Sequence, residues 1–204
     1  QIIFPDRQLM LFAADVLTRH PGAQILYDVK CSRHLAPYIE QHGGRPLMWK
    51  TGHSLLKAKL KETGAPLGGE MSGHIFFSDR WYGFDDGLYA GARLLELLTR
   101  VDDPSALLNA LPQSDSTPEL HLELAEGENV ALIDKLRDDA FPGHQRIVTI
   151  DGLRVEYADG FGLARSSNTT PVVVMRFEAE NPAALARIQA EFKRAITTAR
   201  PDVE

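Results

Sequence analysis

Apolar residues in the first half of the chain follow two spacings. Helical spacing predicts helices over residues 5–20, 32–42 and about 55–64, then a longer one, capped by Asp85 or Asp86, in which Leu88, Ala92, Leu95 and Leu98 share a face. Short apolar runs predict strands at residues 23–29, 47–49 and 74–77. Strands that alternate with helices favour a mainly parallel sheet with helices packed on it. We therefore expect a three-layer α/β domain.

The pattern changes near residues 101–117, where Asp-rich and Pro-rich stretches bracket one short helical segment. Beyond this region, strands are predicted at residues 120–124, 147–150, 153–157 and 172–177, and helices at 130–140 and 182–200. The Asp151-Gly152 pair indicates a β-hairpin, and Asp159-Gly160 marks a turn before Leu163-Ala164. Residues 1–113 are thus expected to form the α/β domain. Residues 114–204 are expected to form a smaller α+β domain with an antiparallel sheet backed by helices.

Charge and cysteine content narrow the possible partners. The 204 residues carry a net charge of −6, which argues against nucleic acid or an anionic membrane as the main partner. No apolar run approaches the roughly 20 residues that span a bilayer. The single cysteine, Cys31, excludes an internal disulfide and a Cys-rich zinc site, and the His residues lack a metal-binding spacing. We expect a soluble, cytoplasmic protein with no metal site in this chain.

Polar segments follow the predicted strands of the first domain, where ligands collect in parallel sheets. Lys30 lies after the first strand, next to Ser32 as a plausible helix N-cap, and is either a charge for an anion or a solvated lysine. His53 opens the helix after the second strand, where the helix dipole disfavours the imidazolium form. A surface role for His53 is an equal alternative.

The segment Gly68-Gly69-Glu70-Met71-Ser72-Gly73-His74 gives a stronger signal. Its glycines allow the backbone to approach a ligand closely. Glu70 can accept hydrogen bonds from two adjacent sugar hydroxyls, Ser72 can donate and accept, and His74 can exchange a proton near neutral pH. A plain turn explains the glycines but not the three polar side chains. The segment therefore favours a binding loop.

A second polar segment, Arg165-Ser166-Ser167-Asn168-Thr169-Thr170-Pro171, precedes the β-branched strand of the second domain. An Arg fork, hydroxyls, an amide and turn N–H groups can together surround the oxygens of a phosphate monoester. An ordinary Ser/Thr/Asn turn has the same composition. The residues alone leave both interpretations open.

Together these two segments resemble the α-D-phosphohexomutases, most closely the bacterial phosphomannomutase/phosphoglucomutase branch. The similarity continues, in order and approximate spacing, through Pro5-Asp6-Arg7, Asp28-Val29-Lys30-Cys31, Trp49-Lys50-Thr51-Gly52-His53-Ser54 and Trp81-Tyr82-Gly83-Phe84-Asp85-Asp86-Gly87. The resemblance implies that residues 1–113 correspond to the family's third domain and residues 114–204 to its fourth, phosphate-binding domain. Met71 resembles the glucose/mannose branch.

The resemblance also implies roles for matching residues. The substrate-binding residues would be Lys30, His53, Glu70, Ser72 and His74, with His74 a candidate for proton transfer to or from the reacting hydroxyl. The phosphate-binding residues would be Arg165, Ser167, Asn168 and Thr169. The implied ligands are glucose or mannose 1-phosphate and 6-phosphate, interconverted through hexose 1,6-bisphosphate. A monomer is expected.

Two family features have no counterpart in this sequence: the phosphoserine loop and the Asp-Gly-Asp-Gly-Asp-Arg loop that binds Mg²⁺. Without them the chain lacks the groups that transfer phosphate. We therefore expect the C-terminal half of a longer, magnesium-dependent mutase, inactive alone, whose partner is the N-terminal half. The alternatives are a naturally short, non-catalytic sugar-phosphate-binding or regulatory module, and an acid–base isomerase that uses Glu70 and His74.

Overall fold

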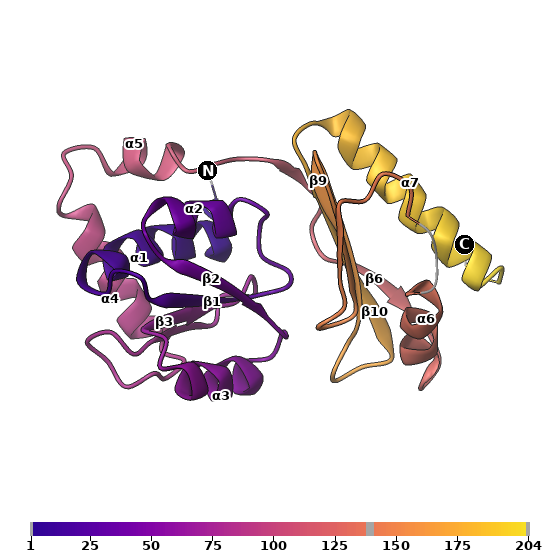
Figure 1. Cartoon of the computed structure of the whole chain (residues 1–204), viewed down its shortest axis with the longest axis horizontal. Helices are drawn as coiled ribbons and strands as arrows, with labels where there is room; N and C mark the ends of the chain where they lie inside the picture. The colour runs from indigo at the N-terminus through magenta and orange to yellow at the C-terminus, as the bar shows by residue number, and fades with distance from the viewer. Residues whose placement is uncertain (1, 138–140, 203–204) are drawn as a thin grey trace. The chain divides into compact units, whose positions relative to one another are not determined.

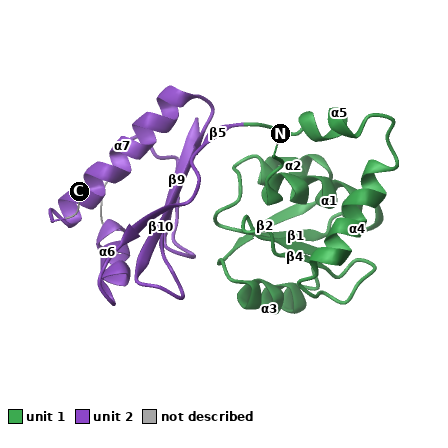
Figure 2. Cartoon of the chain, turned by 180° about the vertical axis from the view of Figure 1, so that it is seen from behind, with its two compact units in different colours: residues 1–113 green, residues 114–204 purple. Residues whose placement is uncertain are grey.

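The computed structural model describes residues 2–137 and 141–202, so the end of the helix predicted over residues 130–140 lies outside the described residues. The chain divides into two compact units, residues 1–113 and residues 114–204 (Figure 2). Each unit has its own hydrophobic core. The units are therefore described separately.

The first unit is built on a four-stranded sheet with the order β2-β1-β3-β4. β1, β2 and β3 run parallel, and β4 is antiparallel to β3. The strands are β1 (Gln24–Asp28), β2 (Arg45–Trp49), β3 (Leu67–Gly69) and β4 (Ile75–Phe77). The helices are α1 (Pro5–Arg19), α2 (Leu35–Gln41), α3 (His53–Thr63), α4 (Gly87–Leu98) and α5 (Pro104–Asn109).

Helices cover both faces of this sheet. Figure 1 shows α1 and α2 on one side and α3 on the other. Ile25 and Tyr27 of β1 belong to the core made with α1 and α2, whereas Leu26 belongs to the smaller core made with Leu56 and Leu60 of α3. This alternation follows from the strand period of two residues. The predicted three-layer α/β architecture is confirmed.

The strand β3 was not predicted, because two of its three residues are glycine and carry no side-chain pattern. Packing explains the glycines. A Cβ on Gly69 would lie 2.8 Å from Ile75 Cδ1 and 3.0 Å from Leu9 Cδ1. The interpretation of Gly68 and Gly69 as loop residues that approach a ligand is therefore wrong, because they bring helices close to the sheet instead.

Two helices of the first unit also differ from the prediction. α2 begins at Leu35 rather than at residue 32, and Ser32 is not its N-cap; the Ser32 hydroxyl instead accepts a hydrogen bond from the His34 amide at 3.2 Å. α4 is capped by Asp86, but the face that carries Leu88 and Leu95 is not its buried face, since these side chains are 91% and 65% exposed.

A buried ionic network lies on the inner side of α4, beside the partly buried apolar residues Tyr89, Ala90, Leu94 and Leu97 that pack against the core. Arg93 is 3% exposed, and its Nη2 lies 2.9 Å from a carboxylate oxygen of Asp15 on α1 and 2.9 Å from one of Asp79 after β4. Arg19 and Arg100 also pair with Asp15. The network joins α1, α4 and the segment that follows β4.

The second unit contains a six-stranded antiparallel sheet with the order β5-β10-β9-β8-β7, and β6 also pairs with β10. Helices α6 and α7 lie on one face of it (Figure 2). This confirms the predicted antiparallel sheet backed by helices. The strands are β5 (Asp115–Ser116), β6 (Leu120–Glu123), β7 (Arg146–Val148), β8 (Leu153–Tyr157), β9 (Gly160–Ser166) and β10 (Val172–Ala179). The helices are α6 (Glu128–Leu136) and α7 (Pro182–Ala199).

β9 is longer than the Leu163-Ala164 pair that the sequence indicated. Gly160 and Gly162 interrupt its apolar alternation, and both positions have no room for a side chain. A Cβ on Gly162 would lie 2.3 Å from the ring of Phe192 on α7, and one on Gly160 would lie 2.3 Å from the Glu178 carbonyl oxygen. The glycines allow α7 and β10 to pack closely against this strand.

Candidate functional site

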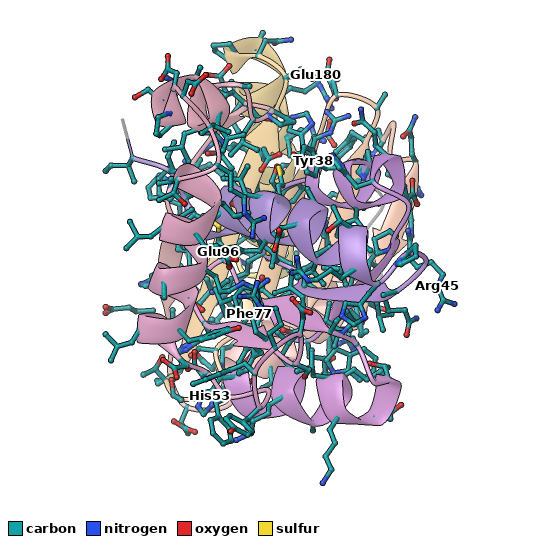
Figure 3. The ribbon with its side chains drawn as sticks, turned by 90° about the vertical axis from the view of Figure 1, so that its left-hand side faces the viewer. Tyr38, Arg45, His53, Phe77, Glu96 and Glu180 are labelled. Carbon is teal, nitrogen blue, oxygen red and sulfur yellow. The ribbon has the colours of Figure 1, made fainter. Side chains whose placement is uncertain are left out.

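Three polar segments leave the parallel strands β1, β2 and β3 at the same edge of the first sheet. They contain Lys30, His53 and Glu70, the three predicted site residues that follow a strand. The carboxyl ends of parallel strands lie side by side, which brings the segments together. Figure 3 shows His53 near the start of α3.

Asp28, the last residue of β1, ties these segments to one another. Its side chain is fully buried. It accepts hydrogen bonds from the Met71 amide at 3.1 Å, the Thr51 hydroxyl at 2.9 Å and the Cys31 thiol at 3.1 Å. Sequence reasoning placed Asp28 in a segment that resembles the family but gave it no role, although a carboxylate that ends an apolar strand is a usable signal.

Glu70 lies at the centre of the third segment and is only 2% exposed. The Gly52 amide donates to its Oε1 at 2.9 Å, and the Ser72 hydroxyl donates to its Oε2 at 3.0 Å. Burial and then the neighbouring Asp28 carboxylate raise the pKa of Glu70. The segments after β2 and β3 are thus joined through a carboxylate whose charged form is costly to bury.

The Glu70–His74 segment is a tight connection between β3 and β4. The Glu70 amide donates to the His74 carbonyl at 2.9 Å, and the Gly73 amide donates to the Glu70 carbonyl at 3.0 Å. Gly73 has φ of +102°, which explains a glycine there. The ring of His74 lies 5.4 Å from that of His53, and its Nδ1 contacts Asp85 Oδ2 at 2.5 Å.

Lys30 is 5% exposed, so the alternative of a solvated lysine is wrong. The segment that carries it is fixed to α1, because the Ser32 amide donates to Asp6 Oδ2 at 2.9 Å. Asp6 is itself 1% exposed. The structure therefore brings Lys30, His53, Glu70, Ser72 and His74 to one edge of the first unit.

In the second unit, Arg165 lies near the end of β9, opposite the hairpin turn between β7 and β8. Its Nε donates to Asp151 Oδ2 at 3.0 Å, and the pair is 6% and 14% exposed. Its Nη2 is buried and has no hydrogen-bond partner among the residues that the structure describes. Asp151 was interpreted only as a turn residue, and the structure adds it as the partner that orients Arg165.

The Ser166–Thr170 segment is organised by its own hydroxyls and by α6. The Thr170 hydroxyl donates to Ser167 Oγ at 3.0 Å, and the Ser167 amide donates to the Val172 carbonyl at 2.8 Å. Asn129, which is 5% exposed, donates to Ser166 Oγ at 2.7 Å. The hydroxyls of Ser167 and Thr169 lie 3.5 Å apart. This polar loop and Arg165 occupy the same end of β9.

Neither metal ligation nor membrane insertion has support in the described parts of the chain. Within residues 2–137 and 141–202, no group of three or more His, Cys, Asp or Glu side chains is arranged to hold a metal ion. The helices in these ranges are all too short or too polar to cross a bilayer.

Comparisons with known proteins cover both units. Residues 4–114 match the family model "Phosphoglucomutase/phosphomannomutase, alpha/beta/alpha domain III", and residues 119–195 match "Phosphoglucomutase/phosphomannomutase, C-terminal domain". A phosphoglucomutase of Neisseria meningitidis serogroup A is 62% identical over 197 residues, which are 96% of this chain and 43% of the relative. A phosphomannomutase/phosphoglucomutase of Pseudomonas putida is 54% identical over 204 residues, which are 100% of this chain and 44% of the relative.

Solved structures give the same result. A phosphoglucomutase/phosphomannomutase family protein from Burkholderia thailandensis superposes with a TM-score of 0.95 at 72% identity, covering 100% of this chain and 43% of that one. An N-acetylphosphoglucosamine mutase of Aspergillus fumigatus shares the fold alone, with a TM-score of 0.67 at 15% identity over 98% of this chain and 44% of that one. The chain spans less than half the length of these relatives.

Proposed function

The chain belongs to the phosphoglucomutase/phosphomannomutase family, and we propose that it supplies the sugar-binding and phosphate-binding half of an enzyme that interconverts hexose 1-phosphate and hexose 6-phosphate. Residues 1–113 would bind the sugar, and residues 114–204 would hold the phosphate that is not transferred. One observation carries the proposal: a buried carboxylate, Glu70, joins the segments after two parallel strands, at the sheet edge that also carries Lys30, His53, Ser72 and His74.

Sugar recognition would depend on Glu70 and Ser72. Each Glu70 oxygen already accepts one hydrogen bond, and a carboxylate has about four acceptor positions, so two remain for adjacent sugar hydroxyls. The Ser72 hydroxyl donates to Glu70 and can still accept. A glucose or mannose ring would thus be oriented by paired hydroxyls, with Lys30 and His53 along the same edge.

His74 would exchange the proton of the reacting hydroxyl. Its side chain is 42% exposed, so a substrate can reach the ring. A hydroxyl that attacks a phosphoryl group loses its proton, and the reverse reaction returns it, so one imidazole can serve both directions.

Phosphate binding would use Arg165, Ser167, Asn168 and Thr169. The Nη2 of Arg165 supports this proposal, because it is buried without a hydrogen-bond partner among the described residues and would gain a charge-assisted hydrogen bond from a phosphate oxygen. Asp151 would fix the guanidinium plane. The hydroxyls of Ser167 and Thr169 are close enough to contact neighbouring oxygens of one phosphate group.

The groups that transfer phosphate would belong to the part of the relatives that this chain does not span. The donor set here does not fit Mg²⁺: Glu70 and Asp28 accept hydrogen bonds from protein groups, and Asp85 faces His74. These residues would therefore not hold the magnesium ion. A phosphoserine, Mg²⁺ and hexose 1,6-bisphosphate as intermediate would complete a cytoplasmic, monomeric mutase.

Titration of the 204-residue chain with glucose 1-phosphate and mannose 1-phosphate tests the proposal. With half the cleft absent, we expect a Kd in roughly the micromolar-to-millimolar range. Backbone amide NMR shifts should change in residues 70–74 and in residues 165–170. Shifts absent from both segments contradict the proposal. Turnover by the chain alone, without metal or bisphosphate, would favour an acid–base isomerase instead.

A further inference from the structure

Two consecutive carboxylates, Asp85 and Asp86, precede α4 and have separate partners. Asp86 is the helix cap: its Oδ1 accepts from the Tyr89 amide at 2.9 Å and its Oδ2 from Trp81 Nε1 at 3.2 Å. Asp85 takes no part in capping and contacts His74 Nδ1 at 2.5 Å through Oδ2. The sequence left open which of the two caps the helix, and the structure assigns Asp85 a different task.

The backbone on both sides of Asp85 is fixed. Asp85 forms an isolated antiparallel bridge with Phe76 of β4, the strand that follows His74. The next residue, Asp86, is held at the N-terminus of α4. A short β-bridge and a helix cap therefore place the Asp85 carboxylate beside the imidazole.

We propose that Asp85 is a positioning residue that holds His74 with its Nδ1 protonated and its Nε2 free to take the substrate proton. A carboxylate can only accept hydrogen bonds, so the neutral ring must present the Nδ1–H to it. The lone pair of the neutral ring then lies on Nε2. When Nε2 takes a proton from a hydroxyl, the ring becomes a cation next to an anion and keeps its orientation.

Other groups near His74 leave this assignment unchanged. The Glu70 carboxylate interacts with His74 through its charge but is hydrogen-bonded to Gly52 and Ser72. The ring of His53 lies 5.4 Å away between centroids, tilted by 44°, and makes no hydrogen bond to His74 among the described contacts. Asp85 is therefore the group that selects the tautomer. The inference rests on the proposed role of His74 as the proton acceptor.

The first experiment reads the tautomer directly in the 204-residue chain. Two-bond ¹H–¹⁵N correlation spectra, recorded where the rings are neutral, distinguish Nδ1–H from Nε2–H. His42 and His144 contact carbonyl oxygens through Nδ1 and are internal references for the Nδ1–H form. His20 contacts Asp79 through Nε2 and is the reference for the other form. We expect His74 to match His42 and His144.

The Asp85→Asn variant tests the cause. An amide accepts from one tautomer and donates to the other, so the selection is lost and the Nε2–H form of His74 should appear. Asp86→Asn is the matched control, because asparagine still caps a helix and Asp86 does not contact His74. A wild-type His74 in the Nε2–H form overturns the proposal. So does an unchanged tautomer in Asp85→Asn with the fold intact.

The second experiment measures kinetics in the mutase that contains this chain. His74→Ala should lower kcat by about 100-fold or more. Asp85→Asn should lower kcat by about 10-fold or more with KM within about threefold, and adding it to His74→Ala should change little, since residues that act through one another are non-additive. Asp86→Asn should leave kcat unchanged.

These outcomes separate the positioning role from the proposed function. If His74→Ala keeps full kcat, the proposed function of His74 fails while the tautomer result can still stand. If His74→Ala is impaired and Asp85→Asn keeps full kcat, the function stands and the positioning role of Asp85 is refuted. A purely structural role would lower the melting temperature of Asp85→Asn without the change in tautomer.

Discussion

Replacing Arg165 by alanine should weaken the binding of sugar phosphates and also destabilise the second unit. Two nitrogens of the guanidinium differ in the structure: Nε donates to Asp151 at 3.0 Å, and Nη2 is buried without a partner among the described residues. A phosphate bound to Nη2 would make a charged hydrogen bond, which contributes about 1.5–3 kcal/mol. The expected loss of affinity is therefore about 10-fold to 150-fold.

The same substitution leaves the Asp151 carboxylate, 14% exposed, without its Arg165 partner. Loss of one partner of a mostly buried charged pair costs about 1–3 kcal/mol of folding free energy, so the melting temperature should fall as well. Arg165→Lys keeps the charge but not the planar fork, and should bind more weakly than wild type while losing less stability than Arg165→Ala. Binding and folding are thus both affected by one side chain, and both must be measured.

Isothermal titration calorimetry with glucose 1-phosphate and with inorganic phosphate gives the affinity, and urea denaturation gives the folding free energy. Arg137→Ala is the matched control, since Arg137 makes an ion pair with Asp134 on the exposed surface of α6. Both quantities should then change by less than about 1 kcal/mol. An Arg165→Ala variant that is less stable but binds phosphate within twofold of wild type would refute the phosphate role and leave Arg165 as a structural residue.

Three further substitutions test other parts of the structure. Glu70→Gln should lower glucose 1-phosphate affinity by about 10-fold or more. Because burial raises the folded-state pKa of Glu70, the stability that its protonated form contributes is lost as pH rises through that pKa. In urea denaturation, the variant should therefore be more stable than wild type at pH 8 but not at pH 4. Gly152→Ala should cost about 2–4 kcal/mol of folding free energy and weaken phosphate binding, since its Cβ would lie 2.4 Å from the Ala164 carbonyl oxygen at φ of +75°. Gly143→Ala is the control and should cost about 1 kcal/mol, because Gly143 has φ of +76° and nothing within 4 Å of its Cβ position. Equal costs would contradict the steric argument. Arg93→Met should cost about 1–3 kcal/mol, because it removes the buried guanidinium that Asp15 and Asp79 share while Arg19 still contacts both, against less than about 1 kcal/mol for the exposed Arg80→Ala; a loss no larger than the control's would show that Arg93 contributes nothing to stability.

The folding stability of the wild type should fall at low pH, because the network around Arg93 lowers the pKa of a carboxyl group. Burial works against ionisation, but hydrogen bonds from Arg19, His20 and Arg93 lower the pKa of Asp79 to about 2 from an ordinary value of 3.8. A depressed carboxyl pKa adds stability above the ordinary value, and this stability is lost as pH falls through about 2. Circular dichroism of acid unfolding should therefore show a steeper loss in this window for wild type than for Arg93→Met.

Sequence reasoning found helices and strands wherever the apolar side chains repeat with the period of a helix or a strand. β1, β2 and β4 are apolar runs, α7 has one buried stripe, and α1 has apolar residues at helical spacing, so they were predictable. It failed at β3, where glycine removes the pattern, and on α4, where the buried face carries Arg93 and the apolar residues Leu88 and Leu95 are exposed. In both places, tertiary packing decides and the local pattern does not.

The candidate site was predictable in its residues but not in its contacts. The polar segments stand out because they follow strands or contain many hydrogen-bonding groups. Their partners do not: Asp28 is 43 positions from Met71, and Asp151 is 14 positions from Arg165. A carboxylate at a strand end or in a turn marks such a partner only in part, and only the folded chain shows which candidate segment it accepts hydrogen bonds from.

Residues 78–86, the segment that contains Asp85, are anchored to the first unit at both ends. At one end, the Asp79 carboxylate and carbonyl accept from Arg93, and the Asp79 amide donates to the Pro66 carbonyl at 3.0 Å. At the other end, Asp86 caps α4. Because Asp85 lies between these anchors, loss of Arg93 loosens one of them while His74 and Asp85 themselves remain. Arg93→Met should therefore raise the Nε2–H population of His74 as Asp85→Asn does, but to a smaller extent, and this joins the stability of the first unit to the protonation of its candidate catalytic histidine.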